Sequence, residues 1–145
     1  MKIYYAGPLF CQAELEFNEK VAAMLREKGY EVFLPQEGPD IRGLMSDPST
    51  DKRKVMRGFF ADDLRQIDSS DVFLFIMDGR VPDEGACFEL GYAYAKGKPC
   101  FALKTDVRES EYGTDNAMLV GSLDGRMYAD IPSLLFAIST MNRKT

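Results

Sequence analysis

The sequence predicts a doubly wound α/β sandwich with a mainly parallel, five-stranded sheet, built as a single domain over residues 1–145. Residues 71–77 are too apolar for a half-exposed strand and fit a strand buried on both faces of a parallel sheet. Strand-like runs alternate with helix-like ones, as in doubly wound folds. A chain of 145 residues, 46% of them hydrophobic, can build one core without disulfides or metal.

The first third of the chain reads as a βαβ unit. Ile3 to Ala6 form a β-rich run, and from about Gln12 apolar residues recur at helical spacing up to Gly29. Glu31–Pro35 reads as a second, short strand. Because such crossovers are right-handed by strong precedent, we expect a parallel sheet from its start.

The stretch from Gln36 to about Asp51 is rich in Gly, Pro, Ser and Asp, which predicts an irregular loop. A loop of this length is uncommon in a small domain unless it forms a lid or a binding segment. A lid and a plain surface insertion are equally compatible with this composition.

A second helix is expected from about Lys54 to Ile67, with Phe60, Leu64 and Ile67 as its buried stripe. Asp63 falls on that stripe, whereas Asp62 is rotated by about 100° away from it. A carboxylate on an apolar face needs a partner or a function. Helical spacing alone leaves two interpretations open, a bond to a neighbouring loop or a role in chemistry.

The last part of the chain continues the alternation of strands and helices. The predicted central strand 71–77 leads into a helix that contains Glu89, and the later segments give two more strands and a final helix. They are a strand at Pro99–Leu103, a polar stretch from Lys104 to Arg126, a short edge strand at Met127–Ala129 and a closing helix at Ile131–Met141. The complete order is typical of a flavodoxin-like or Rossmann-like topology.

Composition excludes several classes of function. The chain has no histidine, so Ser-His triads and histidine metal sites are excluded, and catalysis must use carboxylate, Tyr, Lys or Cys side chains. A net charge of −5 with interspersed signs argues against nucleic acid as a partner. Three cysteines without paired metal-ligand spacing suit reduced thiols in the cytosol. No apolar signal segment or membrane span is evident, so we expect a cytoplasmic protein.

Three carboxylates are the candidates for chemistry: Asp63, Asp83 and Glu89. The last two flank a helix start at the carboxyl end of the central strand, where ligands bind in open α/β sheets. Gly85, Ala86 and Gly91 add little bulk around Glu89, which suits a pocket floor. The alternative is structural: Asp83 caps the helix and Glu89 forms a buried ion pair.

These residues resemble the nucleoside 2-deoxyribosyltransferase family over most of the chain, in order. The likeness is carried by Tyr4-Tyr-Ala-Gly-Pro8, by Asp62-Asp-Leu64 with Ser70-Asp-Val72, and by Asp83-Glu-Gly85 with Phe88-Glu-Leu-Gly-Tyr-Ala93. A Glu six residues after one Asp, with a second Asp twenty residues further upstream, makes the combination specific.

The resemblance implies a role for each matching residue. Glu89 matches the nucleophile, Asp63 the acid near the base and Tyr4 the residue that orients the nucleophile. The implied substrate-binding residues are Asp83, a ligand of the sugar 5′-hydroxyl, with Gly7, Gly85 and Asn116. In relatives an Asn of a neighbouring subunit completes the 5′-hydroxyl site, and Asn116, after Tyr112-Gly113, is the matching residue across a gap.

The implied reaction exchanges nucleobases on 2-deoxyribose with retention, through a covalent glycosyl-Glu89 intermediate and with slow hydrolysis as a side reaction. We expect Glu89 to be ionised near the helix amino terminus, Asp63 to protonate the leaving base, and Tyr4 to hold Glu89 and crowd the 2′ position. No cofactor or metal is required. The partners are 2′-deoxynucleosides and nucleobases, with no nucleic acid or membrane, and the resemblance implies a homo-oligomer. Relatives also use a terminal carboxylate, but Asn142–Thr145 offers no motif to match.

Two rival functions remain. A deoxynucleoside 5′-monophosphate N-glycosidase shares the Glu but places a serine where this chain has Asp83, whose charge would repel a phosphate. A non-catalytic nucleotide-binding domain would keep the fold and lose the reaction, but it would have no need for a nucleophile.

Overall fold

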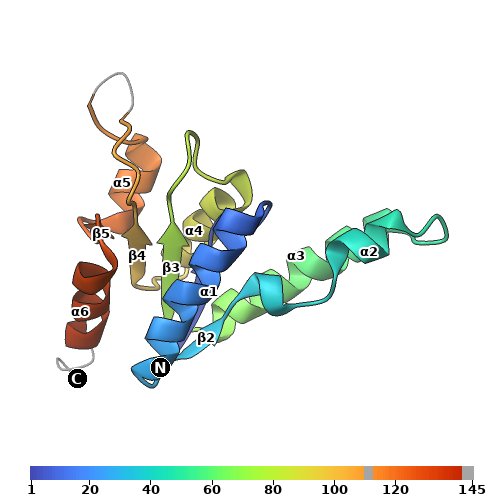
Figure 1. Cartoon of the computed structure of the whole chain (residues 1–145), viewed down its shortest axis with the longest axis horizontal. Coiled ribbons are helices and arrows are strands. Elements are labelled where there is room, and N and C mark those ends of the chain that lie inside the picture. Colours follow the sequence, from blue (N-terminus) through green and yellow to red (C-terminus); the bar gives the residue numbers. More distant parts are fainter. Residues whose placement is uncertain (110–112, 142–145) are drawn as a thin grey trace.

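The computed structural model describes residues 1–109 and 113–141. Within them the chain forms one five-stranded sheet in the order β2-β1-β3-β4-β5, with every neighbouring pair parallel (Figure 1). The strands are β1 Lys2–Ala6, β2 Glu31–Phe33, β3 Val72–Ile76, β4 Cys100–Leu103 and β5 Met127–Tyr128. This is the doubly wound, flavodoxin-like order, so the predicted fold class is confirmed.

Helices cover both faces of the sheet. They are α1 Gln12–Glu27, the 3₁₀ turn η1 Pro35–Glu37, α2 Ile41–Ser46, α3 Lys52–Ser69, α4 Glu84–Ala95, α5 Ala117–Leu123 and α6 Ile131–Met141. One apolar core joins the sheet to α1 and α6, and a second joins it to α3, α4 and α5. Within the described ranges, none of these helices is both long and apolar enough to cross a membrane.

The central strand β3 is buried along its whole length, as its apolar sequence predicts. It pairs with β1 on one side and β4 on the other, and Tyr4 lies opposite Phe73. Asp71 stays outside the strand, and its carboxylate accepts a hydrogen bond from the Lys2 backbone N–H at 2.7 Å. The helix that follows β3 therefore starts beyond the carboxyl end of the most buried strand.

The prediction of an irregular loop from Gln36 to Asp51 was wrong in part, because this stretch contains α2 and the end of η1. Pro35 opens η1, and the Asp40 carboxylate caps α2 by accepting from the Arg42 N–H at 3.0 Å. A helix of six residues is too short to show a helical period in sequence.

The polar stretch from Lys104 to Arg126 also contains an unpredicted helix, α5. Asn116 caps it by accepting from the Met118 N–H at 2.9 Å. Leu119 and Leu123, one turn apart, supply its buried side. Two buried leucines in a polar segment are a weak sequence signal.

The burial expected for Phe60 on α3 was also wrong, since its side chain is 53% exposed. Ile67 is fully buried as expected, and Leu64 is partly buried. Figure 1 shows the reason: the first half of α3 projects away from the sheet together with α2, and only its last turns lie against the sheet. Phe60 packs instead on Phe88 of α4, with ring centroids 5.8 Å apart.

Candidate active site

The site is built around a hydrogen bond between Tyr4 in the middle of β1 and Glu89 in the second turn of α4. The Tyr4 hydroxyl donates to Glu89 Oε1 at 2.8 Å. The Tyr4 side chain is fully buried, whereas Glu89 is partly buried. Two residues singled out from the sequence, 85 positions apart, are thus brought into direct contact.

Tyr4 is held in place by aromatic packing from both neighbouring strands. Its ring stacks on Phe33 of β2 and Phe73 of β3, with centroids 5.3 and 5.6 Å apart. Both partners lie opposite Tyr4 in the sheet register. The sequence reasoning missed them, although pairing the three strands in phase would have placed these rings on one face. Because Tyr4 is fully buried, its hydroxyl contacts Glu89 and does not face solvent.

Asp63 on α3 approaches the same hydroxyl. Partial burial raises the pKa of Asp63, a hydrogen bond with Tyr4 opposes this, and the nearby charge of Asp62 raises it further. The carboxylate expected on the inner face of α3 thus meets the Tyr4–Glu89 pair. The charge of Asp63 in turn raises the pKa values of both Tyr4 and Glu89, which places this carboxylate near the pair.

Burial also controls the protonation of the other two groups. The pKa of Glu89 is raised from its ordinary 4.5 to about 7, mainly by burial, against the Tyr4 hydrogen bond, with Asp63 and Asp83 adding repulsion. The pKa of Tyr4 is raised far above its ordinary value by burial and by the two carboxylates, so Tyr4 stays a neutral donor. Burial therefore works against ionisation of Glu89, and its role as an ionised nucleophile stays a prediction.

Asp83 caps α4, and its Oδ2 accepts from the Ala86 N–H at 2.8 Å. The structural interpretation of Asp83 is therefore confirmed. A carboxylate can accept about four hydrogen bonds, so the cap does not use up its capacity to bind a ligand. Gly85 is exposed in the first turn, where a Cβ would lie 3.2 Å from Asp83 Oδ2. The expected roles of Asp83 and Gly85 in substrate binding stay predictions.

Gly7 follows β1 directly and packs against the end of β3. A Cβ at this position would lie 2.8 Å from Ile76 Cβ, a distance that real Cβ atoms do not reach. Glycine is therefore required here for close packing, and a contact with substrate stays a prediction.

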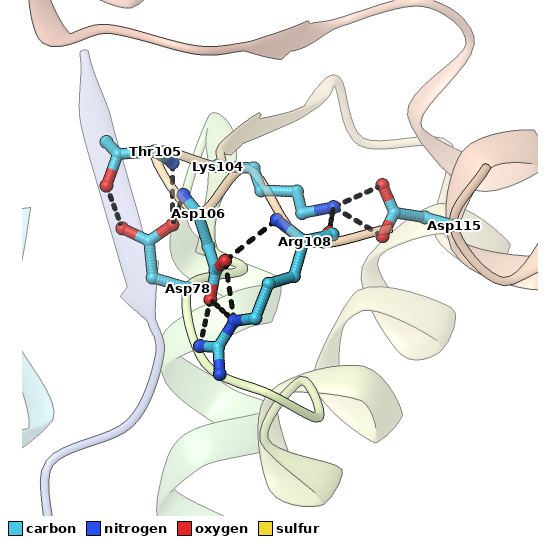
Figure 2. A network of polar contacts seen from close by, with 6 residues as sticks. All are labelled: Asp78, Lys104, Thr105, Asp106, Arg108 and Asp115. Carbon is cyan, nitrogen blue, oxygen red and sulfur yellow. Dashed lines mark hydrogen bonds and ion pairs between the residues drawn. The ribbon is translucent and has the colours of Figure 1, made fainter. Parts of the chain in front are cut away.

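Asn116 directly precedes α5 in the connection that follows β4. Figure 2 shows the polar contacts that join this connection to Asp78, just after β3. Asp78, just after β3, accepts from the backbone N–H groups of Thr105 and Asp106 at 2.6 and 2.8 Å and from the Thr105 hydroxyl at 2.6 Å. Lys104 donates to Asp115 at 2.7 and 2.9 Å. Asn116 itself caps α5, and its role in a neighbouring site stays a prediction.

Some of the residues considered in the sequence analysis lie outside the part of the chain that the structure describes. Tyr112 and the tail Asn142–Thr145 lie outside the described residues. Among the residues that are described, no cluster of three acidic or cysteine side chains is arranged to hold a metal ion. Two surface hollows, one on the first turns of α3 and one between β5 and α6, contain neither Tyr4 nor Glu89.

The fold and the site define a class of protein: a parallel α/β domain that gathers two carboxylates and a buried tyrosine beside the helix after its central strand. The model of the nucleoside 2-deoxyribosyltransferase family matches residues 3–124. The chain belongs to this family.

Individual relatives agree with the family assignment. A conserved protein of Enterococcus faecalis superposes with a TM-score of 0.79 at 31% identity, covering 97% of this chain and 98% of that one. A 2-deoxyribosyltransferase of Bacillus psychrosaccharolyticus gives 0.75 at 26% identity, covering 93% and 90%. A putative 2'-deoxynucleoside 5'-phosphate N-hydrolase of Thermofilum pendens is 29% identical over 104 residues, 71% of this chain and 67% of that protein. Together they support an enzyme of deoxyribosyl transfer or of the related N-glycosidase reaction.

Proposed function

We propose that the protein transfers the 2-deoxyribosyl group from a 2′-deoxynucleoside to a second nucleobase. The observation that carries the proposal is the hydrogen bond of 2.8 Å from the Tyr4 hydroxyl to Glu89 Oε1, and the charge of Asp63 acts on both groups. Such a bond fixes one oxygen of the carboxylate and leaves Oε2 free to attack carbon.

In the first step Glu89 Oε2 attacks the anomeric carbon as the glycosidic C–N bond breaks, through an oxocarbenium-like transition state. The bond electrons leave with the base, and Asp63 supplies the proton that makes the base a good leaving group. Burial raises the pKa of Asp63, which keeps more of it protonated at neutral pH. Burial raises the pKa of Glu89 to about 7, so the attacking, ionised form should become more abundant as the pH rises through this value.

In the second step the acceptor base attacks the same carbon, the bond to Glu89 breaks, and Asp63 takes a proton from the acceptor. Two inversions at one carbon give overall retention. Water that enters in place of the acceptor gives slow hydrolysis. The scheme needs no cofactor or metal.

The other predicted residues would bind the sugar. Asp83 would accept from the 5′-hydroxyl while it caps α4, with Asn116 of a second subunit completing that site, and Gly7 and Gly85 would let the substrate approach closely. This arrangement requires a homo-oligomer.

The second candidate is hydrolysis of 2′-deoxynucleoside 5′-monophosphates, favoured by the relative in Thermofilum pendens. Asp83 opposes it, since its carboxylate would lie next to a dianionic phosphate. A non-catalytic binding domain is the third, and the Tyr4–Asp63–Glu89 cluster opposes it.

The test is to incubate the protein with 2′-deoxyinosine and either adenine or cytosine, and to follow nucleosides and free deoxyribose by chromatography. New 2′-deoxyadenosine or 2′-deoxycytidine supports the proposal and shows the base preference. Free hypoxanthine without a new nucleoside, especially if the 5′-monophosphate is the better donor, contradicts it in favour of the hydrolase. If no donor reacts, the remaining interpretation is a non-catalytic binding domain.

A further inference from the structure

A buried polar network lies on the opposite face of β1 from Glu89, centred on Asn18 of α1. Asn18 is only 3% exposed and stands in the apolar stripe that continues through Val21, Ala22 and Leu25. Its Nδ2 donates to the Pro8 carbonyl at 2.9 Å and to Gln36 Oε1 at 3.0 Å. Its Oδ1 accepts from the Tyr5 hydroxyl at 3.1 Å. The side-chain amide is thus satisfied on both of its ends.

The network joins segments that leave two neighbouring strands at their carboxyl ends. Pro8 belongs to the connection after β1, and Gln36 belongs to η1, just after β2. Gln36 is tied in turn to α1, because its Nε2 donates to the Leu15 carbonyl at 3.0 Å. Asn18 therefore fixes both connections against one helix.

The connection from β1 to α1, residues 7–11, is held at further points along its length. Gly7 packs against Ile76 of β3, as described above. The Phe10 N–H donates to Glu14 at 2.7 Å, and the Phe10 carbonyl accepts from Arg42 of α2 at 2.9 Å. The Phe10 side chain nevertheless stays 65% exposed. The backbone is fixed while an aromatic ring is presented to solvent.

This connection directly follows β1, the strand that carries Tyr4. Ala6, the residue before it, packs in the same apolar cluster as Ala86 and Leu90 of α4, which lie on either side of Glu89 in sequence. A fully satisfied buried network specifies one backbone position, which an apolar core of the same size specifies less strictly. The network thus fixes the backbone where the ligand-binding edge of the sheet meets α4.

We infer that Tyr5, Asn18 and Gln36 are positioning residues for the acceptor base: they hold residues 7–11 as a wall of the site, so that the second base and not water reaches the deoxyribosyl group. This inference rests on the proposed function. None of the three side chains needs to touch the reacting atoms, and their effect is on the partition between transfer and hydrolysis.

The test compares Asn18→Leu, which keeps the side-chain size and removes all three hydrogen bonds, with Ser70→Ala as the matched control. Ser70 is equally buried at 3% exposure, and its hydroxyl donates to the Gln66 carbonyl at 2.7 Å, just before the amino end of β3. Both variants lose stability. We expect Asn18→Leu to raise the acceptor KM about tenfold and to increase the hydrolysed fraction, while Ser70→Ala leaves both unchanged.

If Asn18→Leu does not fold, Tyr5→Phe replaces it in this test, because the Tyr5 substitution removes only one hydroxyl group. It should shift the partition in the same direction by about two- to threefold. This inference alone is overturned if the wild type exchanges bases and the ratio of transfer to hydrolysis in Asn18→Leu and Tyr5→Phe equals that in Ser70→Ala. A wild-type protein that exchanges no base overturns the proposed function, and the inference falls with it.

Discussion

The Tyr4–Glu89 pair and the connection from β4 to α5 are both fixed side-chain assemblies, but they are held by different forces. Tyr4 is fully buried between the rings of Phe33 and Phe73 and makes one hydrogen bond to Glu89. In the described parts of this connection, residues 104–109 and 113–116, no such ring stacking occurs. The connection is held by Asp78, which accepts three hydrogen bonds, and by the Lys104–Asp115 ion pair, whose side chains are 11% and 17% exposed (Figure 2).

The two assemblies differ in how they accommodate the charge of a carboxylate. Around Glu89 the apolar surroundings fix geometry but penalise charge, which raises its pKa to about 7. Around Asp78 the backbone N–H groups and a hydroxyl compensate the charge, at the cost of many partners that must all be present. In the proposed mechanism the reacting groups belong to the first assembly, and the second only has to keep its shape.

The largest effect is expected from Glu89→Gln, which keeps size and removes the charge. Transfer should fall by on the order of 10³-fold or more, because no nucleophile remains. Glu84→Gln, exposed in the first turn of the same helix, is the control and should retain activity. Initial rates of base exchange check both. Comparable activity in Glu89→Gln would contradict the mechanism.

The same substitution should stabilise the fold. Because the pKa of Glu89 rises from 4.5 to about 7 on folding, its stabilising contribution is complete below pH 4.5 and is lost as the pH rises through 7. Glu89→Gln should thus gain on the order of 2 kcal/mol over the wild type at pH 8 and nothing at pH 4. Urea unfolding at both pH values measures the difference. A variant that is less stable at pH 8 would show that the buried charge is compensated.

Asp63→Asn is expected to have the next largest effect on activity, about 10²- to 10⁴-fold, because it removes the proton donor. The loss should be smaller for a donor whose base leaves without protonation. Asp68→Asn is a matched control, since that carboxylate lies on the same helix and pairs with Lys96 at the surface at 3.0 Å. Rates with two donors of different leaving-group basicity measure the contrast, and an equal loss for both donors would remove Asp63 from proton transfer.

Tyr4→Phe removes a hydrogen bond that lowers the pKa of Glu89, so that pKa should rise above 7 in the variant. The ascending limb of kcat/KM against pH should shift to higher pH, with a loss of about 10- to 100-fold at neutral pH. Tyr92→Phe is the control, because the Tyr92 hydroxyl also bonds a carboxylate, Asp68, but away from the site. If the ascending limb of kcat/KM does not shift, ionisation of Glu89 does not determine this part of the pH profile.

The smallest effects should come from the β4–α5 connection. Asp115→Asn leaves Lys104 without its charged partner and should cost about 1 to 3 kcal/mol of stability. Asp124→Asn, which breaks an exposed contact of 3.8 Å with Arg126, should change it by less than about 0.5 kcal/mol. If Asn116 completes a neighbouring site, only Asp115→Asn should also lower activity, by a few fold. Urea unfolding and initial rates separate the two readouts.

What the sequence predicted well is what periodicity controls. The buried β3, the inward position of Asp63 and the order of strands and helices all follow from apolar spacing. The short helices α2 and α5 do not, because each depends on a single capping side chain, Asp40 or Asn116. The exposure of Phe60 depends on where α3 leaves the sheet, which spacing within one helix does not encode.

For the candidate site too, local sequence patterns predicted some features, and others depend on how the elements pack. Tyr4, Asp63, Asp83 and Glu89 were recognisable from their motifs, but the rings that clamp Tyr4 belong to two other strands, so their part depends on strand pairing. Asn18 did carry a local signal, a polar residue in the apolar stripe of α1. The raised pKa of Glu89 results from burial by several elements, which no local pattern contains.

The projection of α3 also divides the helix into two thermodynamic halves. Ile67 is fully buried, so we expect hydrogen exchange of the backbone amides around it to require global unfolding, and those near Met56, whose side chain is 54% exposed, to exchange through local fraying. Asp63 lies at the boundary between these halves. Any contact that covers the outer turns of α3 should therefore reduce fraying there and restrict the position of Asp63. If Asp63 is the acid that we propose, the order of a surface helix would then affect proton transfer.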